Sequence, residues 1–288
     1  MCRSEIAAAI LQASDPQEFF MQDKLAVQMY TVRDFTKTAQ EFAQALEKIS
    51  AIGYRAVQLS AVGAMNGEYP EVLPEQARQW LDDNGLKCIA THRGWGDLAS
   101  NTQKEIEWHQ ILGCDYTAIG GIPGDYGKDG AAGYKSFVHD ALPVIEQLKA
   151  GGLRWGYHNH AYEFARTSEI GANYAKDASP QTLYDIFIEA GPDFLLEMDI
   201  YWVEHSGTNP ERVIERCKGR LPVIHIKDKE MNGNEPVMAP IGEGNLDWAH
   251  LIPALENAGV EWYCIEQDVC RRDPFDCLKS SFEFLKQQ

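Results

Sequence analysis

The chain has 288 residues, of which 43 are acidic and 26 are basic, so its formal net charge is −17. This charge opposes binding to a phosphate backbone and argues against a nucleic-acid partner. The length fits a single domain with a well-buried core, and the seven cysteines contain no CxxC pair, as expected for reduced thiols in a reducing compartment.

The N-terminus shows no recognisable targeting segment. It carries Glu5 and only the short apolar run AAAIL, without the basic start or the apolar core of a signal peptide. No run in the chain approaches the length of a membrane span. We therefore expect a cytoplasmic protein without a membrane partner. Residues 1–22 are expected to form an N-terminal extension and residues 23–288 one domain, with translation starting at either Met1 or Met21.

Eight short runs rich in β-forming residues alternate with amphipathic helical stretches, which is the pattern of repeated βα units. In chain order the runs are LAVQMY (25–30), AVQLS (56–60), KCIATH (87–92), YTAIGG (116–121), RWGYHNH (154–160), FLLEMD (194–199), PVIHIKD (222–228) and WYCIEQD (262–268). Thr38 and Glu41 form a capping box before one helical stretch, and glycines end the helical stretches at positions 53, 85, 113, 151, 191 and 259. The sequence therefore predicts an α/β fold, a (β/α)8 TIM barrel. A doubly wound open sheet is the competing layout, but no GxGxxG motif follows the first strand.

Four of these runs carry a side chain that can bind a metal at or near their C-terminal end: His158, Asp199, His225 and Glu266. An imidazole or carboxylate at the end of an apolar strand would be buried without a partner unless it points into a shared polar site. In a barrel of this type the active site lies at these strand ends. A mixed set of nitrogen and oxygen ligands is typical of a divalent metal site, and Mn, Zn, Co, Fe and Mg all remain open.

The motifs LAVQMYTVRD, GYHNHAYEF, EMDIYW, HIKD, PIGEGNLDW and IEQD resemble the xylose isomerase-like TIM barrel superfamily. The likeness is to its sugar phosphate isomerase/epimerase branch, which is related to the inosose dehydratases, and it runs from Leu25 to the C-terminus. The resemblance implies a divalent metal held by a carboxylate after strand five, an Asp after strand six, a His after strand seven and a Glu after strand eight. Asp199, His225 and Glu266 match the last three positions.

The fifth strand departs from that pattern. Many relatives carry Glu-Asn-His there, whereas this chain reads His158-Asn159-His160. Either His158 binds the metal and Glu163 is the free acid, base or substrate-positioning group, or Glu163 completes the metal shell and His158 moves the proton. We favour the first arrangement, because the end of a strand is more rigid than a loop.

Further side chains are expected around the metal. As acids, bases or partners of a developing oxyanion we expect Glu163, Glu266, Lys227 and His92, and as substrate contacts Arg33, Tyr30, His160 and Trp202. Simpler interpretations exist for some positions: His92 and His160 could be ordinary core or rim residues, and Lys227 with Asp228 could be a surface ion pair. Glu243 is expected to order the loop that follows, with Asn245 as a helix N-cap.

The function expected from this site is that of a divalent-metal-dependent isomerase or epimerase of a sugar or polyol, working by proton abstraction next to a carbonyl through a metal-stabilised enediolate. A lyase is the close alternative, since loss of a β-substituent from the same intermediate gives inosose dehydratase-like or 3-oxo-glycoside elimination. A non-catalytic sugar-binding module and a repair nuclease are alternatives of other classes. The nuclease would need a basic groove, which the charge opposes. The expected partner is a small unphosphorylated sugar or polyol, and a homo-oligomer is possible.

Overall fold

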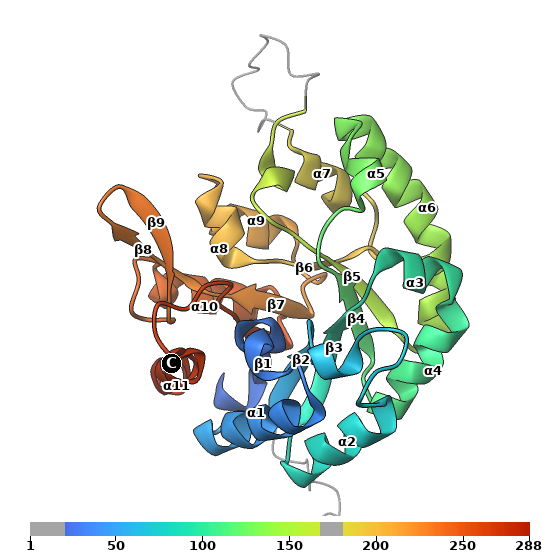
Figure 1. The fold of residues 1–288 in the computed structure, drawn as a ribbon. Helices are drawn as coiled ribbons and strands as arrows, with labels where there is room; N and C mark the ends of the chain where they lie inside the picture. Colours follow the sequence, from blue (N-terminus) through green and yellow to red (C-terminus); the bar gives the residue numbers. More distant parts are fainter. Residues whose placement is uncertain (1–20, 168–180) are drawn as a thin grey trace, which may run out of the picture.

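The structure is a computed structural model that describes residues 21–167 and 181–288. Most of the expected N-terminal extension, residues 1–20, lies outside the described residues. From Met21 onward the described chain forms one barrel surrounded by helices (Figure 1).

Eight parallel strands form the barrel, in the order β6-β5-β4-β3-β2-β1-β10-β7. They are β1 (Leu25–Gln28), β2 (Ala56–Leu59), β3 (Lys87–His92), β4 (Tyr116–Ile119), β5 (Arg154–His158), β6 (Leu195–Glu197), β7 (Val223–Ile226) and β10 (Trp262–Ile265). Between β6 and β7 the ring is completed by one parallel bridge, Asp199 to His225, in which the His225 amide donates to the Met198 carbonyl at 2.8 Å. The predicted TIM barrel is confirmed. Two of the predicted ligands, Asp199 and His225, form the single bridge that closes the barrel between β6 and β7.

Helices cover the outside of the barrel in the order of the chain (Figure 1). They are α1 (Ala39–Ile52), α2 (Pro74–Asp83), α3 (Trp95–Ser100), α4 (Thr102–Leu112), α5 (Gly124–Gly127), α6 (Gly130–Ala150), α7 (Leu183–Ile188), α8 (Ile200–His205), α9 (Pro210–Arg216), α10 (Trp248–Asn257) and α11 (Pro274–Leu285), with short 3-10 turns η1 (Met21–Lys24), η2 (Met29–Phe35), η3 (Gly63–Met65) and η4 (Tyr162–Phe164). The capping box of Thr38 and Glu41 starts α1 as predicted. Several strands are shorter than the sequence runs; β1 ends at Gln28 because that side chain accepts a hydrogen bond from the Tyr30 amide and starts η2.

Strand alternation separates the core into two parts. The outward side chains of the strands, such as Val57, Leu196 and Ile224, belong to the large core under the helices. The inside of the barrel is lined mainly by small residues and by Tyr116, which lies against Gly156 of β5. A Cβ atom at position 156 would lie only 1.9 Å from the Tyr116 hydroxyl, so only glycine leaves room for this ring. Tyr116 thereby fills the barrel interior next to the layer of polar side chains described below.

A hairpin of two antiparallel strands, β8 (Asp228–Asn232) and β9 (Glu235–Ala239), follows β7 and was not expected. It projects from one side of the barrel (Figure 1). Its first residue, Asp228, is fully buried and accepts hydrogen bonds from four backbone amides, including those of Gly242 and Gly244, and from the Trp248 indole. The interpretation of Lys227 and Asp228 as a surface ion pair is therefore wrong, because both are buried and each has other partners.

Asn245 also differs from its expected role as a helix N-cap. The N-cap of α10 is Asp247, and the Asn245 side chain instead accepts a hydrogen bond from the Met231 amide of the hairpin at 3.2 Å. Glu243 orders the loop as expected, through hydrogen bonds from Arg272 and Ser280.

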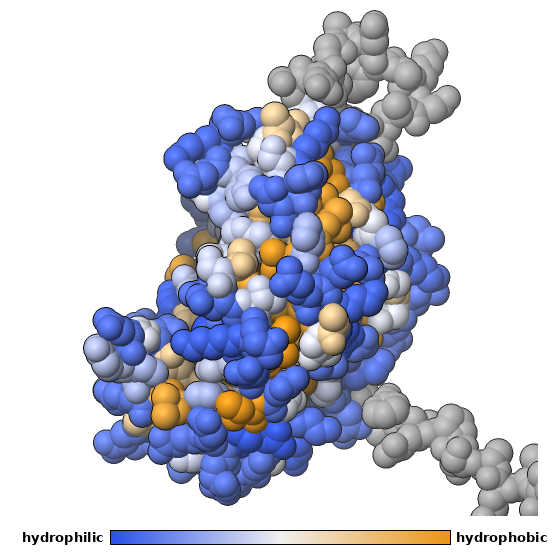
Figure 2. All heavy atoms as spheres, turned by 90° about the vertical axis from the view of Figure 1, so that its right-hand side faces the viewer, coloured by the Kyte–Doolittle hydropathy of each residue, from blue (hydrophilic) through white to orange (hydrophobic). Residues whose placement is uncertain are grey.

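One face of the molecule carries mainly hydrophilic side chains. Figure 2 shows the side that carries α3, α4 and α6, where hydrophilic side chains dominate and apolar ones are scattered between them. Among residues 21–167 and 181–288, no helix combines the length and the apolar character that crossing a membrane requires.

Candidate metal centre

The four predicted ligands meet at the C-terminal ends of their strands. His158, Asp199, His225 and Glu266, here called the outer cluster, each offer one ligand atom, and these atoms lie within 4.8 Å of one another. His158 Nε2 lies 3.8 Å from Asp199 Oδ2, and His225 Nδ1 lies 2.9 Å from Glu266 Oε2. All four side chains are buried. Barrel closure therefore brings together residues that are up to 108 positions apart in the sequence.

Lys227 adds a buried ammonium group to this cluster. Its Nζ lies 2.9 Å from Asp199, 2.7 Å from Glu266 and 3.0 Å from Asp268, and the side chain has no exposed surface. Burial disfavours the charged amine, but the three carboxylates outweigh it and hold the pKa of Lys227 above its ordinary value. The predicted proximity of Lys227 to the ligands is thus seen directly.

A second set of potential ligands lies beside the first and shares two residues with it. It consists of His92, His158, Glu197 and His225, here called the inner cluster. Glu197 Oε2 is its centre, at 2.5 Å from His92 Nε2, 3.3 Å from His225 Nε2 and 3.7 Å from His158 Nδ1. No role was predicted for Glu197. The sequence did contain a signal for Glu197: it lies two residues before Asp199, and residues two apart in a strand point to the same face.

Two amide side chains hold the inner cluster in place. Gln58 donates from Nε2 to Glu197 at 2.7 Å and accepts at Oε1 from His225 Nε2 at 2.6 Å. Gln28 donates in turn to the same Gln58 oxygen at 3.1 Å. Despite burial, Glu197 and Glu266 raise the pKa of His225 to about 10, so without a metal its ring is an imidazolium that donates from both nitrogens.

The donor set and the charge fit a divalent cation. Four carboxylates, those of Glu197, Asp199, Glu266 and Asp268, surround one ammonium and one imidazolium, so two negative charges remain uncompensated. His158 Nδ1 is buried and has no hydrogen-bond partner among the described residues. Buried excess charge and an orphaned imidazole nitrogen both favour binding of a cation with nitrogen and oxygen ligands.

Glu163 is not placed as expected. Its carboxylate accepts a hydrogen bond from the Tyr157 hydroxyl at 2.6 Å and from the His160 amide at 2.8 Å, and it is fully buried. Tyr157 belongs to the core under the helices, on the face of β5 opposite His158. Glu163 is in neither ligand cluster. Of the two arrangements considered for the fifth strand, the geometry favours the one with His158 as ligand, but it makes Glu163 a support for the turn after β5 instead of a free acid or base.

Aromatic side chains form one wall at the rim of the site. The rings of His160 and Trp202 are 5.5 Å apart, and Tyr162 stacks on His160 at 5.4 Å. Among the described residues, His160 Nδ1 and Trp202 Nε1 are buried atoms without a hydrogen-bond partner. Burial, followed by the charge of Lys227, lowers the pKa of His160, so its ring is neutral at neutral pH.

Arg33 and Tyr30 lie in η2, the segment that directly follows β1. The Arg33 guanidinium donates to the carbonyls of Tyr30 and Asp268 at 2.9 and 3.0 Å, and its carbon lies 4.1 Å from the centre of the Tyr30 ring. It thereby ties the loop after β1 to the loop after β10, which carries Asp268. Tyr30 packs against Arg33, so its expected stacking on a sugar would need its other face.

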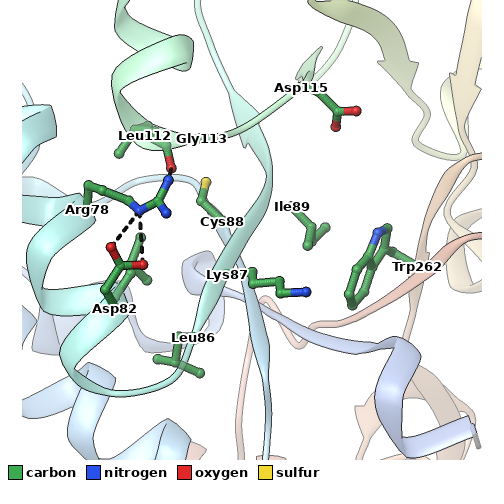
Figure 3. Close-up of a pocket in the computed structure, with 11 residues that line it drawn as sticks. Arg78, Asp82, Leu86, Lys87, Cys88, Ile89, Leu112, Gly113, Asp115 and Trp262 are labelled. Atoms are coloured by element: carbon green, nitrogen blue, oxygen red, sulfur yellow. Dashed lines mark hydrogen bonds and ion pairs between the residues drawn. The ribbon is translucent and has the colours of Figure 1, made fainter.

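Hollows elsewhere on the surface lie apart from both clusters. One of about 310 Å³ opens at the N-terminal ends of the strands, where Arg78 pairs with Asp82 while Lys87 and Trp262 lie across from them (Figure 3). Catalytic residues in TIM barrels come from the other end of the strands. This hollow is therefore not a candidate active site.

Comparison with known proteins identifies the family of this fold. A family model described as xylose isomerase-like TIM barrel matches residues 46–288. The chain belongs to this family. No curated protein sequence matches the chain. The family resemblance inferred from the strand-end motifs is confirmed.

Solved structures of the xylose isomerase-like fold superpose well on this chain. A sugar phosphate isomerase/epimerase from Parabacteroides distasonis is 19% identical, with 96% of each chain covered and a TM-score of 0.73. The probable 3-DHS dehydratase AsbF from Bacillus anthracis is 14% identical over 91% of this chain and 98% of that chain, with a TM-score of 0.65. The IOLI protein, solved with a bound zinc atom, is 13% identical over 90% and 95%, with a TM-score of 0.64. At these identities the likeness establishes the fold.

Proposed function

We propose that this protein is a divalent-metal-dependent isomerase or epimerase that moves a proton next to a carbonyl group of a sugar or polyol. The observation that carries the proposal is the outer cluster: two imidazoles and two carboxylates, buried together at the catalytic end of a TIM barrel, with Lys227 in contact with both carboxylates. The zinc bound by the IOLI neighbour and the names of the other neighbours point in the same direction.

His158, Asp199, His225 and Glu266 would hold the metal. When bound, a divalent cation supplies electrostatic stabilisation for negative charge on the substrate oxygens. Lys227 contributes a fixed positive charge, because three carboxylates hold its buried ammonium in one position. Such a preorganised charge needs no rearrangement as negative charge develops on the substrate.

His160 is the proton acceptor that the rim offers. Its ring is neutral and its Nδ1 has no hydrogen-bond partner among the described residues, so none of these groups competes with a substrate for this nitrogen. Trp202 and Tyr162 flank the ring and form an apolar wall of the kind that packs against the C–H face of a sugar. The free indole N–H of Trp202 can donate to a substrate hydroxyl.

A lyase is the second candidate. Elimination begins with the same removal of a proton next to a carbonyl and ends with loss of a substituent from the β-carbon. The observation in its favour is the structural likeness to a probable 3-DHS dehydratase, which covers 98% of that chain.

Deuterium exchange separates these functions. The protein, reconstituted with Mn²⁺, is incubated in deuterated water with keto-sugars, inososes and 3-oxo-glycosides, and products are followed by NMR. Deuterium next to the carbonyl in an otherwise intact carbon skeleton supports the isomerase or epimerase, whereas loss of a β-substituent supports the lyase. The variant His160→Gln should abolish exchange while retaining the metal, and Lys229→Met outside the cluster should exchange normally. A fully metallated protein that exchanges no candidate substrate contradicts the proposal and favours a sugar-binding module.

A further inference from the structure

The rings of His158 and His225 stand between the two clusters and present opposite nitrogens to each. His158 directs Nε2 toward Asp199, at 3.8 Å, and Nδ1 toward Glu197, at 3.7 Å. His225 directs Nδ1 toward Glu266, at 2.9 Å, and Nε2 toward Glu197, at 3.3 Å. The outer and inner clusters are therefore two ligand sets built on the two edges of the same pair of imidazoles.

The inner cluster has the construction of a metal site in its own right. His158 is 96% buried, since only 4% of its surface is exposed, and its Nδ1 has no hydrogen-bond partner within the described chain while it faces Glu197. His92 approaches the same Glu197 oxygen to 2.5 Å and stacks on His225 with ring centres 5.4 Å apart. Gln58 donates to the Oε1 atom of Glu197 at 2.7 Å and so orients this carboxylate, as outer-shell groups orient ligands in metal proteins. A metal in the inner cluster would replace the hydrogen bond between His225 Nε2 and Gln58.

The two clusters differ in the ions they suit. Three imidazoles and one carboxylate form the inner set, and such nitrogen-rich sets with about four ligands favour Zn²⁺ and Co²⁺. The outer set has two imidazoles and two carboxylates, and both carboxylates also contact Lys227; its larger share of oxygen ligands shifts the preference toward harder ions such as Mn²⁺.

We propose that the inner cluster is a second, alternative metal site, which takes zinc-type ions while the outer cluster takes manganese-type ions. A neutral imidazole binds a metal through one nitrogen and keeps its proton on the other. His158 and His225 can therefore complete only one cluster at a time, and the protein binds one metal per chain at either position. This inference concerns the position of the metal and goes beyond the proposed reaction, because it holds whatever substrate the protein takes.

Metal binding by site-specific variants tests the proposal. The variant His92→Ala removes an inner ligand and none of the four outer ligands, while Asp199→Asn does the reverse. Affinities for Zn²⁺ and Mn²⁺ are measured by calorimetry on metal-free protein, and metal content is measured by mass spectrometry. We expect His92→Ala to weaken Zn²⁺ binding by about tenfold or more with Mn²⁺ binding little changed, and Asp199→Asn to do the opposite. The exposed His139→Ala is the matched control, since its side chain is 87% exposed.

Cobalt gives an independent readout of position. The visible spectrum of the Co²⁺-loaded protein reports its ligands, and it should change in His92→Ala but persist in Asp199→Asn. If His92→Ala does not fold, as judged by circular dichroism, Glu197→Gln serves in its place. The proposal is overturned if Zn²⁺ binding depends on Asp199 and not on His92, or if two metals bind per chain at saturation. Neither result depends on deuterium exchange, so the proposed reaction can fail or succeed separately.

Discussion

Lys227 is the residue on which the charge balance of the site depends. Its ammonium is completely buried and contacts Asp199, Glu266 and Asp268 within 3.0 Å. Buried charges are costly to remove from water, and deleting one partner leaves the others uncompensated. Lys229, two residues on, forms an ion pair with Glu204 whose members are 16% and 37% exposed, and it offers a comparison from the same segment.

We predict that Lys227→Met destabilises the metal-free protein by about 3–5 kcal/mol, because three carboxylates lose their buried cation. Lys229→Met should cost about 1 kcal/mol or less, because its ion pair is partly solvated. Urea denaturation of both variants in the presence of a chelator measures the difference. Equal losses of stability in the two variants would contradict a special role for the buried ammonium.

The raised pKa of Glu163 predicts that the stability of the protein depends on pH. Burial is the main cause that raises the pKa of Glu163 from 4.5 to about 7, against the opposing hydrogen bond from Tyr157. Because the pKa is higher in the folded than in the unfolded chain, its stabilising contribution is complete below about pH 4.5 and is lost as the pH rises through about 7. The gap between the two values corresponds to about 3 kcal/mol.

The unfolding free energy of the wild type should therefore fall by about 3 kcal/mol between about pH 5 and about pH 8. This fall should be absent in Glu163→Gln, because the amide does not titrate. Denaturation of the metal-free proteins across this range measures the effect. The variant Glu107→Gln, at an exposed position, should retain the wild-type decline. Parallel curves for wild type and Glu163→Gln would show that Glu163 does not titrate in this interval.

The residue scale also shows where sequence reasoning stops. The period of two along strands predicted that His158, Asp199, His225 and Lys227 share the inside of the barrel, and the structure places them there. The same rule could not predict the partner of a side chain that lies just beyond a strand. Glu163 turned toward Tyr157 because the backbone bends into η4 after His160, and that bend depends on packing.

At the scale of elements, β5 depends on a glycine that accommodates its neighbour β4. An added Cβ at position 156 would lie 1.9 Å from the hydroxyl oxygen of Tyr116 and 2.8 Å from the ring carbon that carries it. Within the described residues that hydroxyl has no hydrogen-bond partner, so its removal sacrifices no bond. A larger residue at position 156 would therefore affect stability through steric overlap with Tyr116, and not through a lost hydrogen bond.

We predict that Gly156→Ala destabilises the protein by about 1–3 kcal/mol through overpacking, and that adding Tyr116→Phe recovers part of this loss. The recovery is partial because the ring carbon remains too close after the oxygen is removed. Unfolding free energies of the two single variants and the double variant give the coupling between the positions. Strictly additive losses would mean that the strands separate and relieve the contact in another way.

The elements that the sequence predicted well are those with local signals. Alternation and capping residues located the eight barrel strands and the start of α1, because those signals lie within a few residues of one another. The β8–β9 hairpin was missed because, among the described residues, its strands pair only with each other and its anchor, Asp228, accepts hydrogen bonds from amides 14 to 18 positions further along the chain. Such contacts follow from the fold and leave no local pattern.

At the scale of the whole molecule, metal binding and folding are linked through barrel closure. The outer ligands come from β5, β7 and the ends of β6 and β10, and the bridge between Asp199 and His225 completes the ring of strands. The unfolded chain cannot hold these four groups together, so a cation binds the native state preferentially. The net charge of −17 introduces a second effect, since any dissolved cation also screens repulsion across the protein.

We predict that Mn²⁺ at about 100 times its dissociation constant stabilises the native protein by about 2.7 kcal/mol, which raises the unfolding temperature by about 5 °C for a chain of this size. Choline chloride at the same ionic strength separates this specific effect from screening and should give a much smaller rise. Glu266→Gln should abolish most of the shift because it removes an outer ligand, whereas His139→Ala should keep it in full. Thermal unfolding followed by circular dichroism makes the comparison. If Mn²⁺ and choline raised the unfolding temperature equally, the acidic surface, and not the strand-end cluster, would be the principal site of cation binding.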